Sequence, residues 1–260
     1  MSYADDLKLA LELADIADAV ALERFRALDL KVETKPDSSP VTDADRATEQ
    51  AIKARLAEAR PNDAIIGEEF GNSGNASRTW IIDPIDGTAN YMRGVPIWAS
   101  LISLAVDGKP VVGVVSAPAL GRRWWAAAGE GAHTRDIDGT ERSIQVSRIT
   151  DAQHASISYN NLRLWDESGK LPQLIEFSRT LWRTRAYGDF YSYMLLAEGT
   201  LEIVAEHGLQ VYDIAALVPI VEEAGGRFSA LEGILTQQSS SVLATNGKLH
   251  EMASEAFRSN

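Results

Sequence analysis

The sequence predicts a mixed α/β protein, with an α+β arrangement in its first half, and the order of its elements supports this fold class. Two helical patterns open the first half, and a series of short β-rich segments follows them. From about residue 150, strand-like and helical segments alternate, which is typical of a layered α/β architecture. No repeat, low-complexity tract or long flexible linker occurs, so we expect residues 1–260 to form one unit with approximate halves at 1–150 and 151–260.

The first half begins with two predicted helices. Apolar residues recur every three or four positions over roughly residues 3–27, which predicts a helix. A polar loop over residues 35–40 follows. Thr42 then precedes a second helical pattern that stops before a proline, so Asp43 and Asp45 fall at its start. The apolar positions are Leu9, Leu13, Ile16 and Val20 in the first helix, and Ile52 and Leu56 in the second.

The remaining elements are predicted from β-rich runs, turn signals and helical spacing. The turn signal Asp107-Gly108-Lys109-Pro110 joins two longer β-rich segments into a hairpin. A second turn, Asp138-Gly139, indicates that the sheet continues as an antiparallel meander. Strands are expected at 64–66, 80–82, 97–106, 111–116, 143–146, 155–158 and 201–205, and helices at 171–178, 190–197 and 213–223.

The composition restricts the kinds of site and partner. The chain has no cysteine, which excludes disulfides, zinc–thiolate sites and thiol nucleophiles and favours a cation with oxygen ligands. Its net charge of -12 argues against nucleic acid, because non-specific nucleic-acid binding depends on clustered Lys and Arg. The acidic, polar start and the lack of long apolar runs argue against a signal peptide and a membrane span. We therefore expect a cytoplasmic protein.

A loop at residues 83–88 follows an apolar strand and carries two carboxylates, Asp83 and Asp86, three residues apart. A capped turn is one interpretation, because Asp, Pro and Thr are common in turns and caps. A metal and phosphate site explains more features of this loop. Proline would stiffen the loop so that both carboxylates point at one cation, the Ile85 carbonyl would add an oxygen, and Gly87-Thr88 would open a helix whose N–H groups face a phosphate.

Two other segments carry candidate carboxylates. Glu68 and Glu69 end a β-rich segment, and a bound metal or a solvated strand end would each explain two neighbouring like charges. Asp213 opens an apolar helical pattern, where a helix N-cap is the simpler interpretation of that segment alone.

Together these segments resemble the inositol monophosphatase family of magnesium-dependent, lithium-sensitive phosphatases. The resemblance covers nearly the whole chain and implies a layered αβαβα sandwich, a single catalytic unit and a homodimer. One departure is Tyr212, where the family commonly has Trp. The matching segments are Lys35, Val41-Thr42-Asp43-Ala44-Asp45, Gly67-Glu68-Glu69, Asp83-Pro84-Ile85-Asp86-Gly87-Thr88, Tyr212-Asp213-Ile214-Ala215-Ala216 and Glu222-Glu223-Ala224-Gly225-Gly226.

The resemblance also implies two to three Mg²⁺ ions in each active site. Two bridging ions would activate a water, neutralise the phosphoryl oxygens and stabilise the leaving alkoxide in an in-line displacement. The implied ligands are Glu68, Asp83 and the Ile85 carbonyl for one ion, Asp83, Asp86 and Asp213 for a second, and Glu68 with waters for a weaker third.

The family's catalytic and substrate-binding roles carry over to further positions. Asp45 and Thr88 would orient the attacking water, and Glu68 belongs with them as a catalytic residue. Glu206 occupies a position that family members use to contact the leaving group. The implied substrate-binding residues are Ile85, Asp86, Gly87, Thr88, Arg185, Asp189, Glu206 and Asp213.

The segment Gly188-Asp189 followed by aromatic residues resembles the branch of the family that dephosphorylates L-histidinol phosphate in histidine biosynthesis. Asp189 and Glu206 would then face the substrate amine. The alternative is that Asp189 caps the helix beginning at Phe190, with Arg185 as a cation facing phosphate or a partner. Histidinol phosphatase is therefore the preferred activity. Inositol, fructose-bisphosphate or nucleotide-bisphosphate phosphatase activity and a regulatory binding role are the alternatives.

Overall fold

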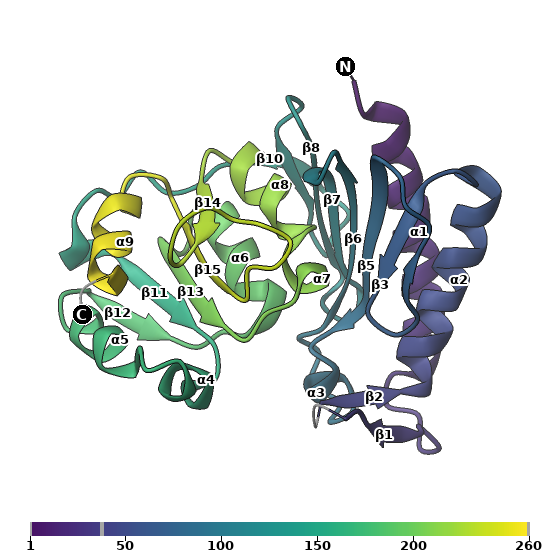
Figure 1. Ribbon diagram of the computed structural model, residues 1–260, viewed down its shortest axis with the longest axis horizontal. Helices are drawn as coiled ribbons and strands as arrows, with labels where there is room; N and C mark the ends of the chain where they lie inside the picture. The colour runs from purple at the N-terminus through teal and green to yellow at the C-terminus, as the bar shows by residue number, and fades with distance from the viewer. Residues whose placement is uncertain (1, 37–38, 259–260) are drawn as a thin grey trace.

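The computed structural model describes residues 2–36 and 39–258. Helices and sheets alternate in five layers across the molecule (Figure 1). Two long helices cover the outer face of one sheet, three shorter helices lie between the two sheets, and the second sheet is covered by helices on its far side. This arrangement confirms the layered αβαβα prediction.

The larger sheet has eight strands in the order β10-β9-β8-β7-β6-β5-β3-β4. Neighbouring strands are antiparallel, as the meander prediction required, except that β3 and β5 run parallel. The sequence analysis missed β4, β8 and β9. The strands are β3 (Ala64–Gly67), β4 (Gly71–Ser73), β5 (Arg78–Asp86), β6 (Ala99–Val106), β7 (Lys109–Ala117), β8 (Arg122–Ala127), β9 (Ala132–Arg135) and β10 (Glu141–Ile144).

The predicted hairpin is the pair β6 and β7, and its turn is tighter than expected. Asp107 and Gly108 have φ values of 50° and 80°, so both occupy the left-handed region that a two-residue type I′ turn requires. Pro110 lies inside β7, opposite Ala105, at an irregularity in the pairing. The structure therefore confirms the hairpin and confines its turn to two residues.

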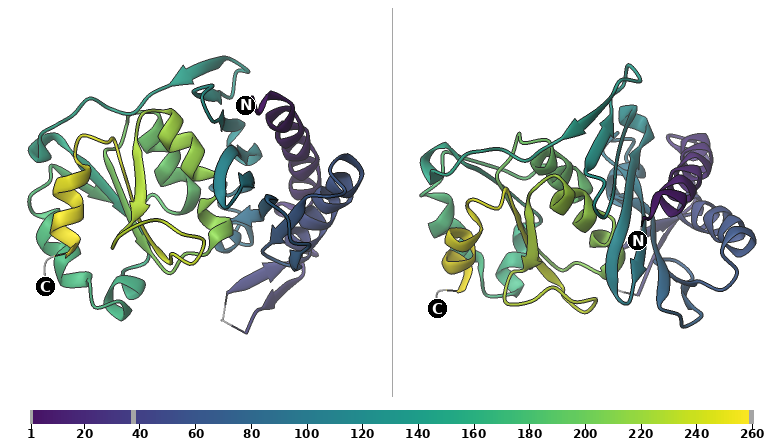
Figure 2. Two further views of the ribbon diagram at one scale, coloured as in Figure 1. Left: turned by 45° about the horizontal axis from the view of Figure 1, so that its top comes forward. Right: turned by 90° about the horizontal axis from the view of Figure 1, so that it is seen from above.

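Helices α1 (Ala4–Arg24) and α2 (Asp43–Ala59) pack side by side on the outer face of the eight-stranded sheet. Figures 1 and 2 show these two helices as an outer layer at one side of the molecule. The buried face of α1 differs from the predicted one, because Ile16 and Val20 are only half-buried. Alanines occupy much of the buried face instead, and their small size allows the helix backbone to lie close to the sheet. The buried apolar residues of α1 are Leu9, Ala10, Leu13, Ala14, Ala17 and Ala21.

A short hairpin connects the two outer helices. β1 (Val32–Thr34) pairs with β2 (Pro40–Thr42), so the predicted loop at 35–40 is shorter than expected, since Pro40 belongs to a strand. Asp37 and Ser38 of that loop lie outside the described residues.

The second sheet has five strands in the order β12-β11-β13-β15-β14. β12, β11 and β13 are parallel, whereas β15 is antiparallel to both β13 and β14. The sequence analysis found β11 and β13 but missed the other three strands. The bounds are β11 (Ser156–Tyr159), β12 (Arg183–Arg185), β13 (Ile203–His207), β14 (Arg227–Ala230) and β15 (Ser241–Thr245).

The middle layer contains α6 (Asp189–Ala197), α7 (Val211–Ile214) and α8 (Leu217–Glu223). α8 packs against β7 and β8 of the larger sheet and against α6, which in turn packs on β13. The prediction of one helix over 213–223 was wrong, because the chain forms two helices separated at Ala215-Ala216. The break lets α7 contact β5 while α8 lies along the sheet.

Helices α4 (Leu162–Glu167), α5 (Leu171–Ser178) and α9 (His250–Arg258) form the last layer. The prediction for α5 was correct, whereas α4 and α9 were missed. Two short 3₁₀ helices lie at Pro118–Leu120 and Ala152–His154, and α3 (Thr88–Tyr91) follows β5 as expected.

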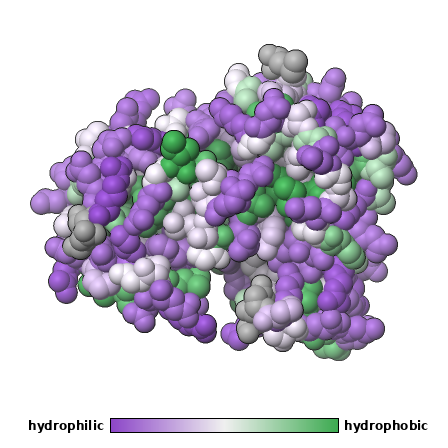
Figure 3. All heavy atoms as spheres, in the orientation of Figure 1, coloured by the Kyte–Doolittle hydropathy of each residue, from purple (hydrophilic) through white to green (hydrophobic). Residues whose placement is uncertain are grey.

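The surface is mostly hydrophilic and is indented between the two halves at the lower edge of the view in Figure 3. In the same orientation, α3 of the first half and α4 of the second lie on either side of this edge (Figure 1). No helix in the described part of the chain is both long and apolar enough to cross a membrane.

Candidate active site

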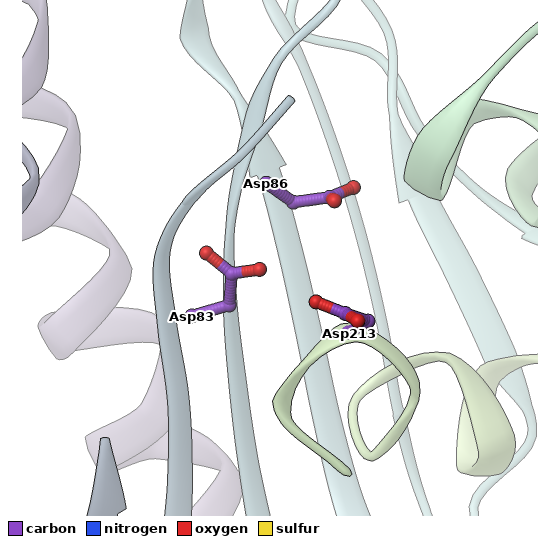
Figure 4. Close-up of side chains that lie close together, drawn as sticks. All are labelled: Asp83, Asp86 and Asp213. Carbon is purple, nitrogen blue, oxygen red and sulfur yellow. The ribbon is translucent and has the colours of Figure 1, made fainter. Parts of the chain in front are cut away.

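Three aspartates from distant parts of the chain meet beside the end of β5. One carboxylate oxygen each from Asp83, Asp86 and Asp213 lies within 4.8 Å of the other two. Asp83 and Asp86 come from the end of β5 and Asp213 from α7, and their carboxylates face a common space (Figure 4). Asp83 is buried, and the other two are half-buried.

The irregular end of β5 explains how two carboxylates of one strand can face the same space. The pairing of β5 with β6 shifts register between Asp83 and Asp86. The Ile85 N–H donates to Asp83 Oδ1 at 3.0 Å, which fixes that carboxylate against its own loop. Gly87 then takes a φ of 85°, a left-handed conformation that suits glycine, and the chain turns into α3.

Asp213 is held by its own helix. It is the third residue of α7, and its Oδ2 accepts from the Gln210 N–H at 2.7 Å. Gln210 is therefore the N-cap, and the interpretation of Asp213 as the N-cap was wrong. This reciprocal contact directs Asp213 from the second half of the chain toward the carboxylates of the first.

Burial and repulsion from neighbouring carboxylates raise the pKa values of all three carboxyls. Burial is the largest cause for each, and for Asp83 the charges of Glu68, Asp86 and Asp213 add to it. The pKa of Asp213 is raised to about 7. Like charges this close disfavour joint ionisation unless a cation compensates them, so the electrostatics favour a positively charged occupant.

Glu68 follows β3 and lies next to Asp83, but its carboxylate is also paired with a cation from the chain. Lys35 Nζ donates to Glu68 Oε1 at 2.7 Å and to Glu69 Oε1 at 2.6 Å. Burial lowers the pKa of Lys35, but its hydrogen bonds to both glutamates outweigh this effect, and the net pKa is raised. The pair of like charges at this strand end is therefore compensated by Lys35.

Asp45 and Thr88 form a hydrogen-bonded pair beside the three aspartates. The Thr42 N–H and hydroxyl donate to Asp45 Oδ2 at 2.7 and 2.5 Å, because Thr42 caps α2 and Asp45 is the third residue of that helix. The Thr88 hydroxyl lies 3.1 Å from Asp45 Oδ1 and 3.0 Å from the Ile85 carbonyl oxygen. Burial raises the pKa of Asp45 to about 6, although the hydrogen bonds from Thr42 oppose this shift.

Asp189 does not cap the helix beginning at Phe190, so that alternative was wrong. The Phe190 N–H donates to Asp86 Oδ2 at 2.7 Å, and a carboxylate of the first half thus caps α6. Asp189 has a φ of 50°, and Asn90 Nδ2 donates to its Oδ2 at 3.2 Å. A non-glycine residue in this left-handed conformation costs backbone energy, and here it directs the carboxylate toward Gly87 and Asn90.

A cavity of about 270 Å³ is lined by Asp86 of the first half and by Asp213 and other residues of the second half. Glu206 lies in its wall, where Tyr193 donates to Glu206 Oε2 at 2.9 Å. Glu206 Oε1 has no hydrogen-bond partner within residues 2–36 and 39–258. Burial raises the pKa of Glu206 to about 8, although the hydrogen bond from Tyr193 opposes this shift. The rest of the lining is Asn160, Asn161, Leu164, Asp189, Phe190, Tyr193, Gly208, Leu209 and Leu217.

Arg185 lies apart from these groups. Its side chain is exposed on β12, its guanidinium donates to the Thr184 carbonyl oxygen at 2.7 Å, and it is not among the residues that line the cavity. The structure thus brings the other candidate residues to one region and leaves Arg185 at the sheet edge. Its role in substrate binding stays a prediction.

Sequence reasoning missed two residues that hold the carboxylates. Tyr193 lies on α6, and its contact is with Glu206, 13 positions away on β13, so helical spacing does not predict it. Asn90 follows the Gly87-Thr88 segment closely, but its contact with Asp189 joins residues 99 positions apart. No local pattern predicts such a contact.

The donor set at this site fits a hard divalent cation. All the side-chain donors are carboxylate oxygens, which Mg²⁺ and Ca²⁺ prefer, and the raised pKa values show that they lack compensating charge. Asp83, Asp86 and Asp213 lie close enough together to be candidate ligands of one ion. Glu68 adjoins Asp83, and its carboxylate is paired with Lys35.

Comparison with known proteins agrees with this geometry. The model of the inositol monophosphatase family matches residues 3–260. Histidinol-phosphatases of Streptomyces coelicolor and Mycobacterium tuberculosis are each 52% identical to the chain, over 254 and 249 residues. These matches cover 96% and 95% of the chain, respectively, and 95% of each relative.

The solved structures lead to the same family. An inositol monophosphatase from Zymomonas mobilis is 35% identical, with a TM-score of 0.87 over 100% of both chains. The five-layered fold, the acidic site and the matches over nearly the whole sequence all support the same family assignment. The chain belongs to the inositol monophosphatase family, a family of metal-dependent phosphatases.

Proposed function

We propose that this protein is a magnesium-dependent phosphate monoester hydrolase that converts L-histidinol phosphate and water to L-histidinol and phosphate. The observation that carries the choice of substrate is the pair of carboxylates, Asp189 and Glu206, in the wall of the cavity that Asp86 and Asp213 also line. A substrate whose phosphate lies at the aspartates would direct its distal end toward these two acids.

The proposed metal ligands are Asp83, Asp86 and Asp213 for one Mg²⁺, and Glu68, Asp83 and the Ile85 carbonyl for another, with a weaker third ion near Glu68. When bound, Mg²⁺ would neutralise the phosphoryl oxygens, lower the pKa of a water and stabilise the leaving oxygen. Lys35 would have to leave Glu68 for that residue to act as a ligand. We therefore expect magnesium to compete with Lys35 for this glutamate.

Asp45 and Thr88 would orient the attacking water. Both donors from Thr42 engage Asp45 Oδ2, which leaves Oδ1 for the Thr88 hydroxyl. When Thr88 donates to Asp45, its oxygen lone pairs are free to accept a hydrogen bond from water. The water would then attack phosphorus in line as the bond from phosphorus to the leaving oxygen breaks, with a proton of the attacking water passing toward Asp45 and the leaving oxygen taking a proton from solvent water to give the alcohol.

The chemistry of the distal end favours an amine. L-Histidinol phosphate carries a protonated amine and an imidazole, both able to donate hydrogen bonds to carboxylates. Inositol phosphate offers neutral hydroxyls, which would leave the half-buried Asp189 and the buried Glu206 without a charge partner. Asn90 and Tyr193, the side chains that donate to these acids, are themselves neutral, so the positive charge would come from the substrate.

Similarity to known proteins supports the same substrate. The two histidinol-phosphatases are 52% identical to this chain, compared with 35% for the inositol monophosphatase from Zymomonas mobilis. The fold that all these proteins share explains why they would share a phosphate chemistry. The higher sequence identity to the histidinol-phosphatases favours the histidinol branch of the family.

The test is the ratio of kcat/KM for L-histidinol phosphate to kcat/KM for inositol 1-phosphate. We expect the wild-type protein to prefer histidinol phosphate by at least about tenfold, and Asp189→Ala to lose most of that preference, since one buried charge-assisted contact contributes about 1–3 kcal/mol. A wild-type preference for inositol phosphate, or an unchanged ratio in Asp189→Ala, would contradict the proposal.

We also propose a homodimer, a cytoplasmic location, a role in histidine biosynthesis and a single catalytic unit spanning residues 1–260. The single unit is supported by the site, which takes Asp83 and Asp86 from one half and Asp213 from the other. Sedimentation equilibrium tests the dimer. Separately expressed halves 1–150 and 151–260 test the single unit, since neither half alone should hydrolyse phosphate esters.

A further inference from the structure

Glu49 is a buried carboxylate of α2 that lies outside the proposed set of metal ligands. It is fully buried, and it lies one helical turn after Asp45 on the same helix. A buried acid is costly unless its oxygens are hydrogen-bonded, so its partners indicate what it does. Those partners lie in the loop that carries Glu68.

Both oxygens of Glu49 bind the backbone just after Glu68. The Glu69 N–H donates to Glu49 Oε2 at 2.7 Å, and the Phe70 N–H donates to Oε1 at 3.2 Å. On the other side, the Glu68 N–H donates to the Ile82 carbonyl oxygen of β5 at 3.2 Å. The backbone of Glu68 is thus fixed to the sheet at its own amide and to α2 at the next two amides.

The space for this carboxylate is created by Gly67. A Cβ atom at Gly67 would lie 1.9 Å from Glu49 Oε1, so a larger residue there would displace the acid. Lys53, one turn further along α2, lies 3.8 Å from Glu49 Oε1 and partly balances its charge. The Glu49 carboxylate therefore fills a defined space between α2 and the end of β3.

We infer that Glu49 is a positioning residue that holds Glu68 against Asp83 so that both can bind the same metal ion. The inference rests on the proposed magnesium site. Through Asp45 and Glu49, a single helix would then set both the residue that orients water and the residue that orders a metal ligand.

The experiment measures Mg²⁺ binding by isothermal titration calorimetry in the wild-type protein, Glu49→Gln and Glu49→Asp. Glutamine would place an amide donor against a backbone N–H, and aspartate keeps the charge but is too short to reach both amides. We expect both variants to bind Mg²⁺ about 10-fold more weakly, the size of effect seen when a group that orients a metal ligand is removed. At saturating Mg²⁺, kcat should largely recover.

Glu202→Gln is the matched control. Glu202 is also a buried glutamate that accepts a backbone N–H, from Ser156 at 2.7 Å, but it directly precedes β13 and is not among the candidate metal ligands. It should lose stability without a change in Mg²⁺ affinity. If the Glu49 variants match the Mg²⁺ affinity of Glu202→Gln, the inference is wrong.

Gly67→Ala provides a second variant if those at Glu49 fail to fold. It leaves the acid in the sequence and displaces its carboxylate, so Mg²⁺ affinity should fall in the same direction, and unchanged affinity would overturn the inference. Absence of Mg²⁺ binding in the wild-type protein would instead contradict the proposed function. The two failures are therefore distinguishable.

Discussion

Two sets of carboxylates in this region are held in different ways. The proposed metal ligands Asp83, Asp86 and Asp213 each accept a hydrogen bond from a backbone N–H. The proposed substrate-binding pair, Asp189 and Glu206, accept from the side chains of Asn90 and Tyr193. Backbone donors are present whatever the side chains are, whereas side-chain donors change with a single substitution.

This difference means that the reaction and the choice of substrate depend on different contacts. The arrangement of the metal-binding carboxylates is a property of the strand end and the helix starts, so the fold itself provides it. The arrangement of the substrate-binding carboxylates depends on two particular side chains. Substitutions of the metal ligands should therefore affect all substrates alike, and substitutions of the residues that hold Asp189 and Glu206 should change the choice among substrates.

The largest effect is expected for Asp83→Asn. Activity toward every phosphate ester should fall on the order of 10³-fold or more, because a bound metal contributes several kcal/mol to the transition state. Without metal, the variant should be at least as stable as the wild type, since one of several repelling carboxylates is removed. Calorimetry and thermal unfolding measure both effects, and wild-type Mg²⁺ affinity in this variant would refute the metal assignment.

Thr88→Ala should lower kcat on the order of 10²-fold and leave KM nearly unchanged for both histidinol phosphate and inositol phosphate. The Thr88 hydroxyl contacts Asp45 and the Ile85 carbonyl rather than the distal end of the cavity, so its loss should not discriminate between substrates. Steady-state kinetics with both esters provides the measurement. A change confined to KM would assign Thr88 to phosphate binding instead.

Tyr193→Phe should affect selectivity. It removes the hydrogen bond to Glu206, so the preference for histidinol phosphate over inositol phosphate should fall about 5-fold, as expected for a neutral hydrogen bond of about 1 kcal/mol. Tyr191→Phe is the control, because this tyrosine lies on the same helix and packs against Trp124. Equal ratios of kcat/KM in the two variants would show that Tyr193 has no part in selectivity.

The smallest expected effect concerns pH and stability without metal. Burial raises the pKa of Asp213 to about 7 and that of Glu206 to about 8 in the folded protein, so their ionised forms are disfavoured there. As pH falls from about 8.5 to 7 these groups take up protons in the folded state before the unfolded state does, and stability should rise, with a melting temperature higher by a few degrees.

Saturating Mg²⁺ should reduce this pH dependence, because a cation restores the ionised form of its ligands. Thermal unfolding in chelator and in magnesium, at both pH values, checks the difference. A metal-free protein that loses stability over the same fall in pH would contradict the account of the cluster as uncompensated carboxylates.

The sequence by itself predicted the elements that carry the site. Asp83 and Asp86 lie at the end of a largely apolar strand, Asp45 follows a capping threonine, and Asp213 lies near a helix start, all of which are local patterns. Local patterns are readable because they depend on backbone propensity and on the alternation of buried and exposed positions. The family resemblance added the order of the motifs and the layered fold.

Only the tertiary structure decided which groups touch. The pairing of Lys35 with Glu68, the contact of Asn90 with Asp189 and the exposed position of Arg185 depend on how loops and sheets pack, and no spacing in the sequence encodes them. The alanine-rich buried face of α1 and the break before α8 have the same origin, because close packing against the larger sheet decides which side of α1 is buried and where α8 begins. The local sequence therefore determined which carboxylates are available, and the packing of the two sheets determined what each one faces.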